Sequence, residues 1–249
     1  MSADNAERRS FWPSALPYLV PLFLFLAPGL LADYWPAGRT LLYAVRVLLA
    51  GTAVIAYWRR GAYPELHEPL PGDAALLAGL VGVLVIVVWV ALDQYYPQGL
   101  AEWKSLLLGG GGRAGLRFEH AGKLEAGFDP SMTGQILPPG LALTFRVIGA
   151  VLLVPIIEEL LFRSWLMRSL VDTDFARVPL GTFTWLSFLA TTLVFGLSHA
   201  EWLAGIITGA AFALLLYWRR NLMVCVVCHA VANLTLAIWV LMRGAWGFW

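Results

Sequence analysis

The sequence predicts an all-α fold, a polytopic transmembrane helical bundle of about seven or eight spans. Hydrophobic residues make up 59% of the 249 residues and charged residues only 13%, whereas soluble domains carry about 25% charged residues. A helix needs about 20 apolar residues to cross a hydrocarbon core of about 30 Å. Runs of about this length lie at residues 14–33, 39–58, 73–92, 141–170, 181–199, 202–218 and 221–242. We therefore expect an integral, multi-pass membrane protein.

Charge and aromatic content bear on partners and orientation. The net charge of +1 favours neither a nucleic acid nor an acidic substrate. We therefore expect the chain to contact the lipid bilayer and to bind no nucleic acid. The 12 Trp residues suit membrane interfaces. Loops on the cytoplasmic side of a membrane carry an excess of Lys and Arg. This rule places one set of arginines near the span ends on the cytoplasmic side: Arg8, Arg9, Arg59, Arg60, Arg168, Arg177, Arg219 and Arg220.

The chain divides into three parts. Residues 1–93 hold three spans with little recognisable chemistry, which we interpret as scaffold. Residues 94–140 form a polar loop with equal numbers of basic and acidic residues, and a loop of this length is either functional or disordered. Its run Gly109–Gly112 lacks a following Gly-Lys-Ser/Thr and indicates a flexible linker rather than a phosphate-binding loop. Residues 141–249 hold the candidate chemistry, on a four-helix core.

Two adjacent carboxylates, Glu158 and Glu159, lie inside an apolar run. A charge near the bilayer centre costs roughly 2.5–3.5 kcal/mol on insertion scales, which makes an intramembrane carboxylate a functional candidate. Glu159 and Arg163 are four residues apart and are expected to pair along one helix face. Glu158 is turned from that face by about 100° and has no local counter-ion, so it is the candidate general base. The alternative is that the three residues form only a structural polar clamp.

Two histidines and an asparagine lie in later spans. His199 follows Phe195 by four residues, and Asn233 follows His229 by the same interval. Imidazole can hold or activate water, and an Asn amide can donate to an oxyanion. Each histidine alone is typical of packing, but together with the glutamates they supply the parts for water activation and for stabilising a tetrahedral intermediate. Glu201 is expected at the membrane interface.

The depth of these groups in the membrane presents a difficulty. With spans drawn in simple succession, Glu158 lies near the cytoplasmic end of its helix and His199 near the opposite end of the next. A long or tilted helix over residues 141–170 would bring the two to one depth, provided that the turn after His199 is held within the protein.

The cysteines and metal ligands leave alternatives open. Cys225 and Cys228 precede His229 in a C-x-x-C-H pattern, but this copy lies within a predicted span, so small buried packing residues are the preferred interpretation over haem attachment or a metal site. No His-Glu-x-x-His sequence occurs. Two histidines and a glutamate on three helices can still assemble a zinc site, and residue types alone do not separate that from a metal-free, Glu/His-activated water. No cofactor and no metal is assumed.

Three motifs carry a family resemblance, and they are Glu158-Glu159-Leu160-Leu161-Phe162-Arg163, Phe195-x-x-x-His199 and His229-x-x-x-Asn233. Because the three motifs occur in this order, the chain resembles the CPBP intramembrane endopeptidases, also called Abi or CAAX-protease-like. This family includes the type II CAAX prenyl endopeptidases. The resemblance implies an all-helical membrane fold with a cavity in the bilayer where a peptide bond is hydrolysed.

The same resemblance implies roles for residues of this chain. Glu158 would be the base that activates water together with His199, while His229 and Asn233 would stabilise the oxyanion. Glu159 and Arg163 would support the site. The family has been described both as metalloproteases and as glutamate proteases, so the resemblance leaves the cofactor open.

A narrower likeness points to the CAAX-protease-related proteins that accompany bacterial exosortase/PEP-CTERM sorting systems. It rests on Val154-Pro155-Ile156-Ile157, on Leu180-Gly181-Thr182-Phe183 and on the Trp-rich tail. This likeness implies a sorted or membrane-anchored protein as substrate and a location in the bacterial inner (cytoplasmic) membrane.

The predicted function is an intramembrane endopeptidase that cleaves a membrane-associated protein or peptide. One alternative is a non-proteolytic membrane binding or immunity protein, which would keep the polar cluster for specificity or stability. The other is a proton-coupled transporter, which also uses buried carboxylates and histidines. A transporter predicts internal inverted repeats, and the sequence displays none.

Overall fold

The structure is a computed structural model that describes residues 3–32, 34–93, 129, 135–199 and 201–249. The described residues form helices and turns without a strand, which confirms the all-α prediction. The predicted polar loop at 94–140 falls mostly outside the described residues. The helices outside the long central one are α1 (Ala3–Leu26), α2 (Arg39–Arg59), α3 (Gly72–Asp93), α9 (Trp185–Leu197), α10 (Trp202–Arg219) and α11 (Leu222–Arg243).

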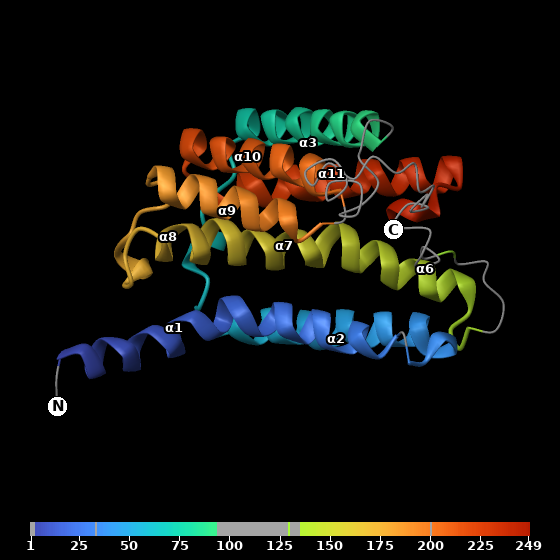
Figure 1. Cartoon of the computed structure of the whole chain (residues 1–249), viewed down its shortest axis with the longest axis horizontal. Coiled ribbons are helices and arrows are strands. Elements are labelled where there is room, and N and C mark those ends of the chain that lie inside the picture. The colour runs from blue at the N-terminus through green and yellow to red at the C-terminus, as the bar shows by residue number, and fades with distance from the viewer. Residues whose placement is uncertain (1–2, 33, 94–128, 130–134, 200) are drawn as a thin grey trace, which may run out of the picture.

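The central helix runs without interruption through several segments of different pitch. It comprises α6 (Pro139–Val147), a π-helical segment (Ile148–Leu153), α7 (Val154–Glu159), a second π-helical segment (Leu160–Leu166) and α8 (Met167–Ser169). Figure 1 shows it between two layers, with α1 and α2 on one side and α3, α9, α10 and α11 on the other. Within the layers α1 packs on α2, α3 on α11, and α9 on α10.

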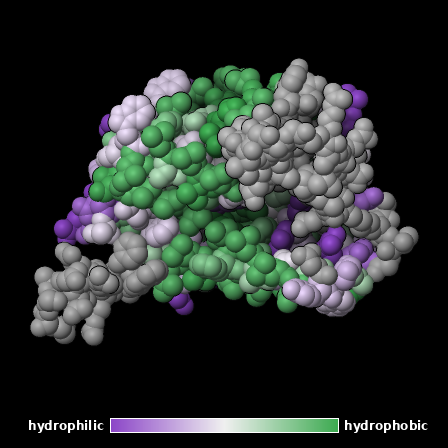
Figure 2. Space-filling view, viewed as in Figure 1, coloured by the Kyte–Doolittle hydropathy of each residue, from purple (hydrophilic) through white to green (hydrophobic). Residues whose placement is uncertain are grey.

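Six helical runs in the described residues are long and apolar enough to cross a membrane, namely Ser14–Leu31, Pro36–Arg59, Gly72–Leu92, Pro139–Ser169, Trp202–Arg219 and Leu222–Arg243. They match six of the expected runs. Apolar side chains on α3 face outward, and Leu76, Leu80, Leu84 and Val87 are 57–68% exposed. Figure 2 shows apolar residues over the middle of the visible face and polar residues towards both ends of the bundle. The chain is an integral multi-pass membrane protein.

The remaining expected run, 181–199, forms a shorter helix. Helix α9 has 13 residues, because a capping box of Thr184 and Ser187 sets its first turn only at Trp185. Gly181, at a φ of +74°, precedes this cap. Helix α9 ends at Leu197 and α10 begins at Trp202, so the chain reverses partway across the bundle. This turn is the one that was expected to be held within the protein.

Glycines allow the closest helix contacts. A Cβ atom on Gly82 of α3 would lie 2.5 Å from the carbonyl oxygen of Cys228 on α11. A Cβ atom on Gly205 of α10 would lie 2.9 Å from the Cα atom of Gly196 on α9. Small residues at such positions let helix backbones approach within the membrane, where packing drives association.

Replacing Gly82 by Leu is therefore expected to push α3 away from α11 and to lower the melting temperature in detergent. Overpacking of this kind costs about 1–3 kcal/mol. The matched control is Gly79→Leu on the same helix, where an added Cβ meets no atom within 4 Å. Equal melting temperatures for the two variants would show that the close contact at Gly82 is not needed for stability.

Candidate active site

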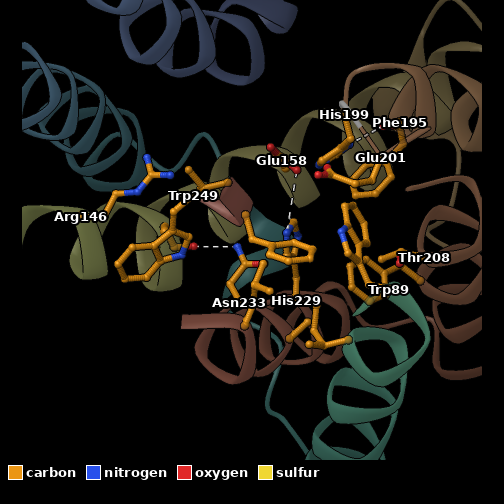
Figure 3. A pocket seen from close by; sticks show the side chains of 17 residues that line it. Trp89, Arg146, Glu158, Phe195, His199, Glu201, Thr208, His229, Asn233 and Trp249 are labelled. Atoms are coloured by element: carbon orange, nitrogen blue, oxygen red, sulfur yellow. Dashed lines mark hydrogen bonds and ion pairs between the residues drawn. The ribbon is translucent and has the colours of Figure 1, made fainter. Parts of the chain in front are cut away.

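A cavity of about 190 Å³ lies among the membrane-spanning helices and contains Glu158 (Figure 3). Its wall is assembled from distant parts of the chain: α3, the central helix, α9, α10 and the turn between them, α11 and the segment that follows α11. The polar residues that line it are Arg146, Glu158, His199, Glu201, Thr208, His229 and Asn233. The Glu158 side chain is 19% exposed, and it is therefore accessible from the cavity.

Glu159, by contrast, is completely buried and does not line the cavity. Its Oε2 lies 3.1 Å from Nε of Arg163, which is the ion pair that the four-residue spacing predicts. Arg163 also donates from Nη2 to the carbonyl oxygen of Gly209, at 3.3 Å, and its Cζ lies 4.3 Å from the ring centroid of Phe195. The buried carboxylate is thus matched by a cation that is itself hydrogen-bonded and stacked, as a buried ion pair requires.

His229 joins the two glutamates. Its Nδ1 lies 2.8 Å from Oε1 of Glu159, and its Nε2 lies 3.9 Å from Oε2 of Glu158. The Glu159 carboxylate, paired with Arg163, accepts hydrogen bonds, so Nδ1 carries the proton and Nε2 is the nitrogen on the side of Glu158. The carboxylate at Nδ1 fixes the ring orientation and can offset positive charge on the ring. The sequence motifs held no signal for this contact, since it depends on how α11 crosses the central helix.

His199 follows the last turn of α9. Its Nδ1 donates to the carbonyl oxygen of Phe195 at 2.7 Å, and the two rings lie 4.8 Å apart between centroids. The Trp89 ring of α3 packs edge-on against the imidazole at 5.6 Å. The Phe195 carbonyl is one of the acceptors that a helix end leaves without an intrahelical partner. This bond leaves Nε2 of His199 as the nitrogen that can hold a water molecule.

Asn233 is fixed to the central helix, where its Nδ2 donates to the carbonyl oxygen of Ala150 at 2.7 Å. Ala150 lies in the first π-helical segment, in which a carbonyl pairs with the N–H five residues later. Five residues after Ala150 is Pro155, which has no N–H. Proline therefore leaves an acceptor that the Asn233 amide uses, and the second N–H of this amide remains for a ligand.

Residues 140–235 match the family model described as Type II CAAX prenyl endopeptidase Rce1-like. Over these residues the chain is similar to the Rce1-like family. Searches of curated proteins and of solved structures gave no match. The match confirms the CPBP/CAAX protease resemblance, and this similarity indicates a membrane protease that acts on a protein substrate.

The Rce1-like segment contains all six residues singled out in the sequence, and the structure brings them together. Glu158, His199, His229 and Asn233 line the cavity, while Glu159 and Arg163 lie behind it. Glu158 and His199 thus line the same cavity. Their roles in chemistry stay predictions.

Three residues of the cavity wall were not anticipated by the sequence analysis. Glu201 was expected at the membrane interface, but it lines the cavity because α10 begins partway across the bundle. Arg146 also lines the cavity, and its charge within an apolar run was a signal that could have identified it. Trp89 lies on α3, a helix that was interpreted as scaffold and that carries no polar motif.

The described residues do not form a metal-binding set. No group of three or more His, Cys, Asp or Glu side chains lies close enough in this part of the chain to hold an ion. Cys225 and Cys228 are buried free thiols outside the cavity wall, and Sγ of Cys225 contacts the carbonyl oxygen of Phe212 at 3.5 Å. We therefore interpret both cysteines as packing residues. The reaction proposed for this cavity uses no metal.

Proposed function

We propose that the protein is an intramembrane endopeptidase that hydrolyses a peptide bond of a membrane-associated protein or peptide through a Glu/His-activated water. The observation that carries the proposal is that Glu158, His199, His229 and Asn233, from three separate helical segments, line one cavity within the Rce1-like segment. These groups supply a base, a water-binding imidazole and donors for an oxyanion.

In the proposed reaction, Glu158 takes a proton from a water molecule that Nε2 of His199 helps to hold. The water oxygen attacks the carbonyl carbon of the substrate, and the carbonyl electrons move onto its oxygen. The free N–H of Asn233 donates to that oxyanion, and so does Nε2 of His229 when it carries a proton. Glu158 then passes its proton to the leaving nitrogen as the C–N bond breaks.

The parts of the chain would divide this work. Residues 141–249 would form the protease core, and residues 1–93 would form the scaffold. Helix α3 is an exception within that scaffold, since Ile86 and Trp89 contribute to the cavity wall. On the narrower sequence likeness, the substrate would be a sorted or membrane-anchored protein of the bacterial inner membrane.

The test is a comparison of membrane proteomes from cells that carry the wild type or Glu158→Ala. We expect one or a few membrane proteins to keep a longer terminus in the variant, and these proteins name the substrate. The matched control is Glu68→Ala, an exposed carboxylate outside the cavity, which should give the wild-type pattern. Identical termini in all three strains would favour a non-proteolytic binding or immunity protein instead.

A further inference from the structure

Pro155 is buried in the central helix three residues before Glu158, and it does not line the cavity. It belongs to the run Val154-Pro155-Ile156-Ile157, to which the proposed reaction assigns no part. A proline inside a membrane-spanning helix removes one backbone hydrogen bond, and it is tolerated where neighbouring groups pair with the freed carbonyl. The group that pairs with this carbonyl therefore decides what the proline does.

The hydrogen-bond register of the helix shows which carbonyl Pro155 frees. Residues Ile148–Leu153 form a π-helical segment, in which each N–H pairs with the carbonyl five residues earlier. The N–H of Val154 continues this register, since it donates to the carbonyl oxygen of Gly149. In the same register an N–H at position 155 would donate to the carbonyl oxygen of Ala150, but proline has no N–H. The carbonyl of Ala150 is therefore the one that the proline leaves open.

Asn233 of α11 takes the place of the missing donor. Its Nδ2 donates to the carbonyl oxygen of Ala150 at 2.7 Å (Figure 3). This contact is possible because α11 packs against both the first π-helical segment and α7. Only the nitrogen of the planar amide can donate to a carbonyl, so this bond orients the whole amide group. Fixing one N–H of Asn233 thus also fixes the direction of the second, on a side chain that lines the cavity.

We propose that Pro155 is a positioning residue for the oxyanion donor Asn233. It acts by having no N–H, because a backbone donor at position 155 would compete with the Asn233 amide for the carbonyl of Ala150. The inference rests on the proposed endopeptidase function, in which the second N–H of Asn233 donates to the oxyanion. A donor that is fixed in advance needs no reorganisation as the charge develops, which is what makes such donors effective. Pro155 thus contributes to catalysis from outside the cavity wall.

The experiment compares residues at position 155 that differ only in the N–H. Pro155→Ala introduces an N–H, whereas lactic acid, the α-hydroxy acid analogue of alanine, introduces an ester oxygen in its place and is incorporated by nonsense suppression. Asn233→Ala is made alone and together with Pro155→Ala. The control is Pro139→Ala, because Pro139 lies in the first turn of α6, where an N–H has no intrahelical partner. The measurements are kcat and KM on a quenched fluorescent peptide of Leu and Ala residues, and the melting temperature, for the full chain in detergent micelles.

Pro155→Ala should lower kcat by about ten- to a hundredfold with little change in KM, because the oxyanion donor is released rather than removed. The ester variant and Pro139→Ala should keep kcat close to that of the wild type. In the Asn233→Ala background, Pro155→Ala should cause no further loss, since the residue through which it acts is gone. Full kcat in Pro155→Ala, an equal loss in the ester variant, or a further loss in the Asn233→Ala background would overturn the inference. The last result would mean that the proline acts on the path of the helix to Glu158.

Melting temperatures test the link between Pro155 and Asn233 without a substrate. With proline at position 155, Asn233→Ala leaves the carbonyl of Ala150 without a donor and should lower the melting temperature by about 2–6 °C. With alanine at position 155 the backbone N–H takes this carbonyl, so the same substitution should lower it by less than about half as much. Equal shifts in both backgrounds would overturn the inference. If the shifts differ as expected but the wild type cuts no peptide, the proposed function fails while the control of Asn233 by Pro155 is upheld.

Discussion

Replacing Glu158 by Gln is expected to lower the rate of peptide cleavage by about 10²–10⁴-fold, the usual contribution of a general base. The amide keeps the shape of the carboxylate but cannot take a proton from water. Among the described residues the ion-pair partner of Glu158 is His229, at 3.9 Å and charged only when protonated, and the Glu158 side chain is partly exposed to the cavity, so the fold should tolerate the change. The measurement is kcat on a peptide substrate in detergent, together with the melting temperature.

Two control variants sharpen this expectation. Glu68→Gln alters an exposed carboxylate outside the cavity and should leave kcat unchanged. Glu201→Gln alters the second carboxylate of the cavity wall. If Glu158→Gln keeps full activity while Glu201→Gln loses it, then Glu201 and not Glu158 is the base.

The second large effect is on stability. Arg163→Leu should leave the fully buried Glu159 carboxylate without its cation, and breaking a buried ion pair on one side costs about 3–5 kcal/mol. The melting temperature should fall by on the order of 10 °C. The double variant Glu159→Leu/Arg163→Leu removes both charges and should recover much of this loss, because apolar residues of similar volume replace a buried pair well.

Among these variants, catalytic activity and melting temperature should not change together. The double variant still lacks the acceptor that fixes Nδ1 of His229, so it should be stable and nearly inactive. Arg177→Ala is the control, because the Arg177–Asp174 pair is exposed and worth under about 1 kcal/mol. A double variant that melts as low as Arg163→Leu would show that the buried charges themselves stabilise the fold.

The local part of the site followed from the sequence. Four-residue spacing predicted the Glu159–Arg163 pair and separated Glu158 from it, because both statements depend only on the geometry of one helix. The contact of His229 with Glu159 and the place of Trp89 beside His199 were out of reach, because each depends on how two distant helices cross. No local pattern encodes such a crossing.

The expected spans were also predictable from local sequence only in part. Length and hydropathy identified the apolar runs, including 181–199, but they did not show that the helix in this run starts only at Trp185. The signal was present in the Thr184-x-x-Ser187 cap, which is a weaker form of the usual capping box. The place of Glu201 in the cavity wall was not predicted for the same reason, since it follows from where α9 ends and α10 begins.

The early end of α9 has a consequence for the protease itself. His199 is hydrogen-bonded to the carbonyl at that end, so its position along the axis of α9 is set by the number of residues between Thr184 and Phe195. Each added helical turn would move the imidazole by about 5.4 Å and would carry it past Glu158 on the neighbouring helix. In the proposed mechanism, the length of α9 would thus act as a ruler that sets how far into the bundle a peptide has to reach before it can be cut.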